Sequence, residues 1–143
     1  MTALRQLDTV DAALGWLAQR GVRALATDSR RVGAGDAFIA WPGFAVDGRE
    51  FVPQALAAGA GACLVEAEGA EAFASLNHEA VAALHGLKAR AGMLASGFMG
   101  RPSEHLHEIA VTGTNGKTST TWWVAQALGT LGRRCGEIGR AHV

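Results

Sequence analysis

The chain has 143 residues, 49% of them hydrophobic and 18% charged, which is about one ordinary domain with enough apolar material for a packed core. Its 13 basic and 13 acidic side chains cancel, so it carries no electrostatic footprint for nucleic acid or an acidic membrane surface. Two cysteines, Cys63 and Cys135, are too few for a disulfide framework or a metal knuckle. No apolar stretch approaches the roughly 18 residues of a membrane span. We therefore expect a cytoplasmic protein with no nucleic-acid or membrane partner.

The first half of the chain alternates between helical and extended patterns. Apolar residues spaced by three or four positions predict an amphipathic helix that Gly21 ends. Short apolar runs, bounded by glycine and proline, predict strands. The expected elements are a helix over residues 4–17, strands over 22–26 and 37–41, a helix over 51–58 and a strand over 62–66. This alternation indicates a small α/β domain.

The second half begins with a long alanine-rich stretch. Apolar residues recur at helical spacing from Glu79 to Met99, which predicts one helix there. Residues 109–111 predict a short buried strand, and residues 120–131 predict a further helix. A strand, a loop and a helix are too little to bury a doubly wound core on their own.

The clearest chemical signal is the run TGTNGKTS, set between the last predicted strand and helix. Its glycines let the backbone bring N–H groups up to phosphate oxygens, and the helix N-terminus adds a partial positive charge. Lys117 can bridge the β- and γ-phosphates, and Thr118 can hold Mg²⁺ through its hydroxyl. A strict Walker pattern would have glycine at Val111, so the loop is a shorter variant. The candidate ATP-binding residues are Thr112, Gly113, Thr114, Asn115, Gly116, Lys117, Thr118 and Ser119.

This loop resembles the ATP loop of the Mur ligase family and of its relative, folylpolyglutamate synthetase. The resemblance implies an enzyme that uses ATP and Mg²⁺ to phosphorylate a substrate carboxylate, after which an amine attacks and forms an amide. It also implies catalytic roles for Lys117 and Thr118, with Thr118 as a metal ligand.

A second resemblance lies nearer the N-terminus, in the strings DSR at 28–30, GDAFIA at 35–40 and DGREFVPQA at 47–55. They are similar to the UDP-sugar-binding domain of Mur ligases that add the third residue of the peptidoglycan stem peptide. The implied substrates are UDP-MurNAc-L-Ala-D-Glu and a diamino acid, either meso-diaminopimelate or L-lysine, and we expect a monomeric enzyme. The implied fold class is a small N-terminal α/β UDP-binding domain followed by the start of a P-loop ATPase α/β domain, which is truncated.

The same resemblance makes Thr27, Ser29, Phe44, Ala45 and Val46 the candidate UDP-sugar contacts. Ser29 offers a hydroxyl and a backbone N–H at a strand end, although the same residue type also suits a simple turn or a helix cap. Many relatives have histidine and glutamine where this chain has Phe44 and Ala45. Contacts at these positions must therefore use the backbone or aromatic packing.

We expect the UDP-sugar-binding domain over residues 1–88 and the beginning of the ATP-binding domain over 89–136. Residues 137–143 read like a translated sequencing-library adapter and are expected to be non-native. The family's enzymes need many more than 143 residues, so this chain alone is expected to be inactive. Three other interpretations stay open: a dipeptide-adding Mur ligase, folylpolyglutamate synthetase, and a non-catalytic UDP-sugar-binding module.

Overall fold

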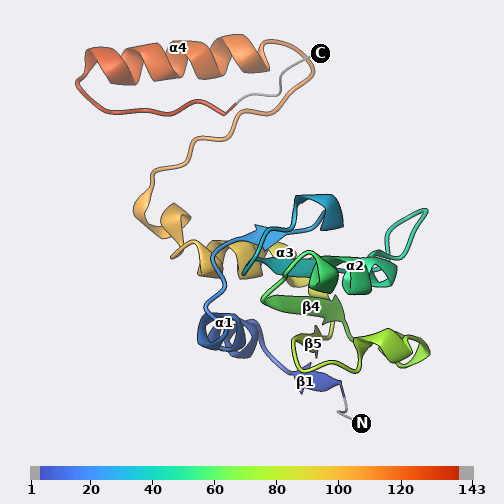
Figure 1. The fold of residues 1–143 in the computed structure, drawn as a ribbon. Coiled ribbons are helices and arrows are strands. Elements are labelled where there is room, and N and C mark those ends of the chain that lie inside the picture. Colours follow the sequence, from blue (N-terminus) through green and yellow to red (C-terminus); the bar gives the residue numbers. More distant parts are fainter. Residues whose placement is uncertain (1–3, 139–143) are drawn as a thin grey trace. The chain divides into compact units, whose positions relative to one another are not determined.

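The computed structural model describes residues 4–138, and the chain divides into two compact units, Met1–His105 and Leu106–Val143 (Figure 1). The division falls later than residue 88, the expected end of the first domain, and that domain boundary stays a prediction. The division is later because residue 88 lies inside helix α3 (Leu87–Phe98), which packs onto the first unit. The assignment of a separate role to each unit stays a proposal.

A five-stranded parallel sheet forms the centre of the first unit. The strands, in chain order, are β1 (Arg5–Leu7), β2 (Leu25–Ala26), β3 (Ala37–Ala40), β4 (Ala62–Glu66) and β5 (Val81–Leu84). Their order across the sheet is β1-β5-β4-β3-β2, so the chain crosses to the far edge after β1 and then returns one strand at a time. Because every pair is parallel, all the strands end at the same edge of the sheet.

Every residue of the inner strands β3, β4 and β5 is buried. All of these residues are apolar except Glu66 at the end of β4. Parallel strands covered on both faces favour such continuous runs over alternation. Side chains point in turn to two cores, Leu64 to one, and Cys63 and Val65 to the other. Burial raises the pKa of the Cys63 thiol to about 12.

Helices cover both faces of this sheet. Helices α1 (Val10–Gln19) and α3 (Leu87–Phe98) pack against each other and add Trp16 and Leu94 to one core. Helix α2 (Val52–Ala57) adds its buried residues to the other core, together with Ala70 of the 3-10 helix η3 (Ala70–Ala72) and Leu76 of the 3-10 helix η4 (Ala74–Leu76). The other described 3-10 helices are η1 (Ser29–Arg31), η2 (Gly48–Phe51) and η5 (Pro102–His105).

The helix predicted over residues 4–17 is wrong in its first part. Leu7 lies in β1, in register with Leu84 of β5, and α1 begins only after Thr9. The Thr9 Oγ accepts a hydrogen bond from the backbone N–H of Ala12 at 3.0 Å, which is the bond of a helix N-cap. The apolar residues keep helical spacing from β1 into α1, so spacing alone does not show that a strand ends and a helix begins at this cap.

The single helix predicted from Glu79 to Met99 is also wrong. Strand β5 occupies its first part, and α3 begins after Gly86, whose φ of 67° is easiest for glycine. A short, fully buried apolar run fits a strand and a helix pattern equally well. Hydrogen-bonded neighbours on both sides, β1 and β4, place this run in the sheet.

The remaining helix and strand predictions for the first unit are confirmed, although most of these elements are shorter than predicted. The strand over 62–66 is β4, the strand over 37–41 is β3, and the helix over 51–58 is α2. Of the strand predicted over 22–26, only Leu25–Ala26 pairs in the sheet.

In the second unit, helix α4 (Lys117–Thr130) confirms the helix predicted over 120–131 and starts earlier. Residues 109–111 form no strand, because a strand needs a hydrogen-bonded neighbour and no other described residue pairs with them. Of the tail expected to be non-native, residues 137–138 are exposed and outside helices and strands, and residues 139–143 lie outside the described residues.

Helix α4 carries apolar side chains at its surface. The rings of Trp122 and Trp123 meet edge to face with their centroids 4.7 Å apart, and both side chains are exposed. No residue of this helix is buried within the described part of the chain. None of the helices in residues 4–138 is long and apolar enough to cross a membrane.

Hydrogen bonds to the side chain of Glu66 connect the end of β4 to the start of α3. Its carboxylate accepts hydrogen bonds from the backbone N–H groups of Gly86 at 2.9 Å, Leu87 at 2.7 Å and Glu68 at 3.3 Å. The N-cap of α3 is a glycine without a side chain, so this carboxylate caps the helix from another element. Burial raises the pKa of Glu66, but the backbone N–H groups outweigh burial, and the net pKa lies below the ordinary value of 4.5.

We expect Glu66→Gln to lower the free energy of unfolding at neutral pH by about 2 kcal/mol, because the amide nitrogen cannot accept a bond from a backbone N–H. A carboxyl whose pKa is lowered by folding stabilises the protein above its unfolded-state pKa. This contribution is lost as the pH falls through the folded-state pKa. Urea unfolding should therefore separate the two proteins at neutral pH and bring them together in acid.

Glu68→Gln is the matched control for this experiment. The Glu68 carboxylate makes no hydrogen bond or ion pair within residues 4–138, so its loss should change stability little. An equal loss of stability in both variants, or a loss at Glu66 that persists in acid, would contradict the capping role.

Candidate functional site

Two candidate substrate segments leave the sheet of the first unit at the same edge. Strand β2 leads into residues 27–29, and its neighbour β3 leads into a turn formed by residues 43–46. Because the strands are parallel, both segments start at the carboxyl edge, where ligands bind in open α/β sheets. The two segments that contain the predicted UDP-sugar contacts therefore begin at the ends of adjacent strands.

Ser29 is buried in η1, and its hydroxyl points toward Gln54 of α2. The Ser29 Oγ donates a hydrogen bond to the Oε1 of Gln54 at 3.2 Å. Thr27, by contrast, is exposed. The hydroxyl of Ser29 therefore holds η1 against α2, and Thr27 is the more accessible of the two predicted contacts.

Asp28 caps η1 and forms a fork with Arg30. One carboxylate oxygen accepts hydrogen bonds from the backbone N–H of Arg30 at 3.0 Å and from its Nε at 2.9 Å. The other oxygen accepts from the Nη2 of Arg30 at 2.8 Å. The bonds from the Arg30 side chain, followed by its backbone N–H, lower the pKa of Asp28 from 3.8 to about 2. Arg30 is exposed, so water screens the charges of this pair.

The turn at residues 43–46 is narrow and closed. The backbone N–H of Gly43 donates to the carbonyl of Val46 at 2.9 Å, and the flanking residues pair as an isolated antiparallel bridge. A Cβ at Gly43 would lie 2.6 Å from the same carbonyl oxygen, so the turn in this form requires glycine there. Phe44, Ala45 and Val46 are all exposed. The turn therefore presents accessible apolar side chains and its own backbone.

The predicted contacts omit Arg49, which is buried beside this turn with 5% of its surface exposed. Its Nε and Nη2 donate to the carboxylate of Asp47 at 3.0 and 2.7 Å. Its Nη1 donates to the backbone carbonyls of Glu68 at 2.6 Å and Glu66 at 3.2 Å. The guanidinium carbon lies 4.8 Å from the centroid of the Phe73 ring. The sequence does contain a signal for this fork, because DGR repeats the Asp-x-Arg spacing of DSR.

In the second unit, the predicted ATP loop leads directly into α4. Gly113 and Gly116 have φ values of 147° and 75°, which favour glycine, and Gly116 is the N-cap of the helix. The Lys117 Nζ donates to the carbonyl of Gly113 at 2.6 Å, with the carbonyl of Thr114 at 3.4 Å. The lysine thus folds back over the loop from the first position of the helix.

The loop has the chemistry to hold phosphate. No side chain caps α4 within the described residues, so the N–H groups of its first turn and its partial positive charge are available to an anion. Lys117, Thr118 and Ser119 are exposed. These residues fit a nucleoside triphosphate, with the hydroxyl of Thr118 as the candidate Mg²⁺ ligand. Residues 4–138 contain no cluster of three His, Cys, Asp or Glu side chains that could hold a metal ion.

A sequence profile described as "Mur ligase family, catalytic domain" matches residues 21–96 of the chain. These residues are more than half of its length. The chain belongs to the Mur ligase family. The matched residues lie within the first compact unit and end before the glycine-rich loop.

Named Mur ligases resemble this chain over most of its length. UDP-N-acetylmuramoyl-L-alanyl-D-glutamate–2,6-diaminopimelate ligase from Acidovorax sp. (strain JS42) is 56% identical over 133 residues, which are 93% of this chain and 26% of the relative. A solved structure of a ligase with the same name has a TM-score of 0.61 and 28% identity, over 82% of this chain and 23% of that chain.

A further Mur ligase structure contains a bound nucleotide. The MurF ligase from Thermotoga maritima, solved in complex with ADP, has a TM-score of 0.56 and 26% identity, over 78% of this chain and 24% of that chain. This chain therefore spans about a quarter of the length of the Mur ligases that it matches.

An NMR titration is expected to give Asp28 a pKa of about 2. Arg30→Gln removes the side-chain fork and should raise this pKa toward 3.8. Arg31→Gln is the matched control, because Arg31 acts on Asp28 only through its charge, as the weakest of the causes that lower the pKa. Equal shifts in the two variants would mean that general positive charge, rather than the fork, holds the pKa down.

Proposed function

We propose that this chain supplies the UDP-sugar-binding unit and the ATP loop of an ATP-dependent ligase that adds meso-diaminopimelate to UDP-MurNAc-L-Ala-D-Glu. The observation that carries the proposal is the 56% identity over 133 residues to the Acidovorax ligase with this name. The proposal places the ligase in peptidoglycan precursor synthesis, as a monomer in the cytoplasm. L-lysine is the alternative amine substrate.

In the first unit, the proposed contacts to the UDP part of the substrate are Thr27, Ser29 and the turn segment 44–46. Their support is the shared carboxyl edge of β2 and β3, together with the exposure of Thr27 and of the turn. Since the Ser29 hydroxyl already bonds to Gln54, its backbone N–H is the better candidate donor to the substrate. The side chains of 44–46 are apolar, so the turn would contribute its backbone groups and the ring of Phe44.

In the second unit, the residues from Thr112 to Ser119 would hold ATP. The backbone N–H groups of the loop and of the first turn of α4 would bind phosphate oxygens. Lys117 would exchange its bond to the Gly113 carbonyl for phosphate oxygens, and the Thr118 hydroxyl would bind Mg²⁺. ATP supplies the phosphoryl group that activates the substrate carboxylate, and the incoming amine then displaces phosphate to form the amide. The positive charge of Lys117 would stabilise the charge that develops on the transferring group.

The dipeptide-adding Mur ligase is the second candidate. The observation in its favour is the TM-score of 0.56 to the MurF ligase from Thermotoga maritima. A non-catalytic UDP-sugar-binding module is a third candidate, and it would bind the nucleotide sugar without consuming ATP.

The test is an assay of the full-length protein with ATP, UDP-MurNAc-L-Ala-D-Glu and either diaminopimelate or lysine. We expect an ATP-dependent tripeptide product with diaminopimelate, identified by mass spectrometry. Lys117→Ala should lower the turnover by about a hundredfold or more, because one preorganised cation at the transferring phosphate is removed. Lys88→Ala is the matched control, since Lys88 is exposed on α3 in the other unit and should leave turnover unchanged.

Two results would change the assignment. Turnover with a tripeptide substrate and D-alanyl-D-alanine, in place of the reaction above, would make the protein the dipeptide-adding enzyme. Nucleotide-sugar binding without any ATP consumption would favour the non-catalytic module.

A further inference from the structure

The first unit contains the same local fork twice, in different surroundings. Asp28 with Arg30, and Asp47 with Arg49, each join a carboxylate that caps a 3-10 helix to the backbone N–H and guanidinium two residues later. Both forks follow the carboxyl ends of neighbouring strands. The Arg30 side chain is 82% exposed, whereas that of Arg49 is 6% exposed. Local capping is therefore common to both, and burial is specific to Arg49.

The burial of Arg49 connects three separate segments. Asp47 lies at the base of the turn formed by residues 43–46, where it pairs with Pro42. The free Nη1 of Arg49 reaches the chain that follows β4, through the backbone carbonyls of Glu66 and Glu68. No other arginine within residues 4–138 joins a carboxylate and backbone carbonyls in this way.

The network continues beyond the arginine. Glu66 accepts a bond from Arg49 on its backbone carbonyl and bonds to the first residues of α3 through its carboxylate. Both buried charges are therefore satisfied: Arg49 bonds to the Asp47 carboxylate and to two backbone carbonyls, and Glu66 bonds to backbone N–H groups. The result is a continuous path of hydrogen bonds from the base of the turn at residues 43–46, through Asp47, to the start of α3.

We propose that Arg49 is a positioning residue for the substrate. It would hold the turn at residues 43–46 in the one orientation that receives the UDP part of the substrate. This inference rests on the proposed function, which places UDP against that turn. Lysine cannot replace arginine here, because a single ammonium cannot fork onto Asp47 and also reach the carbonyl of Glu68.

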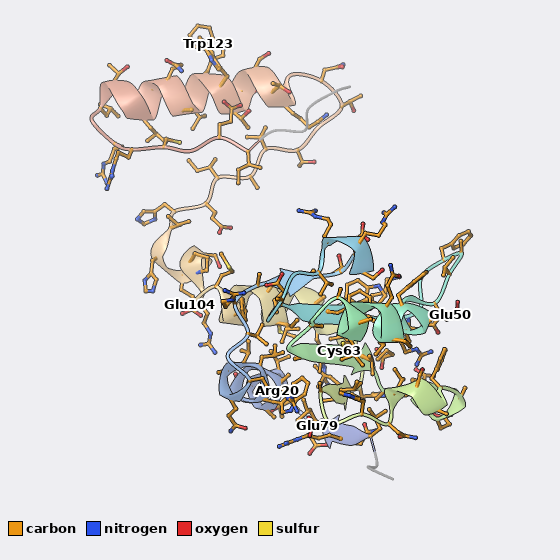
Figure 2. The ribbon with its side chains drawn as sticks, in the orientation of Figure 1. Arg20, Glu50, Cys63, Glu79, Glu104 and Trp123 are labelled. Atoms are coloured by element: carbon orange, nitrogen blue, oxygen red, sulfur yellow. The ribbon has the colours of Figure 1, made fainter. Side chains whose placement is uncertain are left out.

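Arg20 provides a matched control at the opposite edge of the sheet. It also donates to two backbone carbonyls, those of Gly61 and Glu79, which precede β4 and β5. Its guanidinium carbon also lies over an aromatic ring, 5.1 Å from the centroid of Trp16. Figure 2 shows Arg20 beside Glu79 and well away from Glu50, the sequence neighbour of Arg49. Arg20→Lys thus alters the same kind of contact without touching the turn.

The experiment compares Arg49→Lys and Arg20→Lys in the full-length protein. We expect Arg49→Lys to raise the KM for UDP-MurNAc-L-Ala-D-Glu by about tenfold, with little change in kcat or in the KM for ATP. Hydrogen exchange followed by mass spectrometry should show faster exchange in the peptide containing residues 43–48. Arg20→Lys should leave the KM for the UDP substrate and this exchange unchanged, although both variants lose some stability.

Asp47→Asn is the second variant, and it keeps the shape of the side chain and the bonds of Arg49 to the chain after β4. It should raise the same KM and the same exchange rate. The proposal is overturned if Arg49→Lys and Asp47→Asn leave both readouts unchanged, or if Arg20→Lys changes them equally. If the wild-type protein shows no turnover with this substrate, the proposed function fails. The exchange measurement then still decides whether Arg49 holds the turn.

Discussion

Parallel pairing of short strands is the constraint on which the first unit depends. A parallel strand cannot follow its neighbour through a tight hairpin, so each connection must cross a face of the sheet. The crossings supply α1 on one face and α2, η3 and η4 on the other, and α3, which follows the last strand, packs beside α1. Both faces are thereby covered, and the inner strands can be apolar throughout. Because all the strands are parallel, they all end at one edge of the sheet. The candidate substrate segments lie at that edge because of the topology, and nothing in their own sequences specifies it.

At this edge, the two buried charges of opposite sign on Glu66 and Arg49 are held without their side chains pairing with each other. The carboxylate of Glu66 bonds to backbone N–H groups, and the guanidinium of Arg49 bonds to backbone carbonyls and to Asp47. A buried charge that lost its partners would be costly, so each charge restrains the elements that supply those partners. Loops that leave a sheet edge are otherwise the most mobile parts of a domain. The buried charges thus give this part of the edge a stiffness that packing alone does not provide.

Local chemistry in the sequence predicted much of this structure. The strand at 62–66 and the helix at 51–58 carry clear boundary signals and lie where predicted, and the helix after the glycine-rich loop is present but starts three residues earlier than predicted. The helix predicted over residues 79–99 failed because a buried apolar run has no period of its own, and only its neighbours in the sheet make it a strand. Arg49 was missed for a related reason. Its role depends on Glu66 and Glu68, which are distant in the chain and become its partners only in the folded state.

The two cysteines give this protein a built-in reporter of local opening. The Cys63 thiol is buried in the centre of the sheet with a pKa of about 12, while Cys135 is exposed. A thiol reagent at neutral pH should therefore modify Cys135 readily and reach Cys63 only when the strands around it separate. The rate of the slow modification of Cys63 would report how often the first unit opens, without any engineered probe. A ligand held at the carboxyl edge should lengthen that interval, so that one alkylation experiment would follow binding through the thiol at the core.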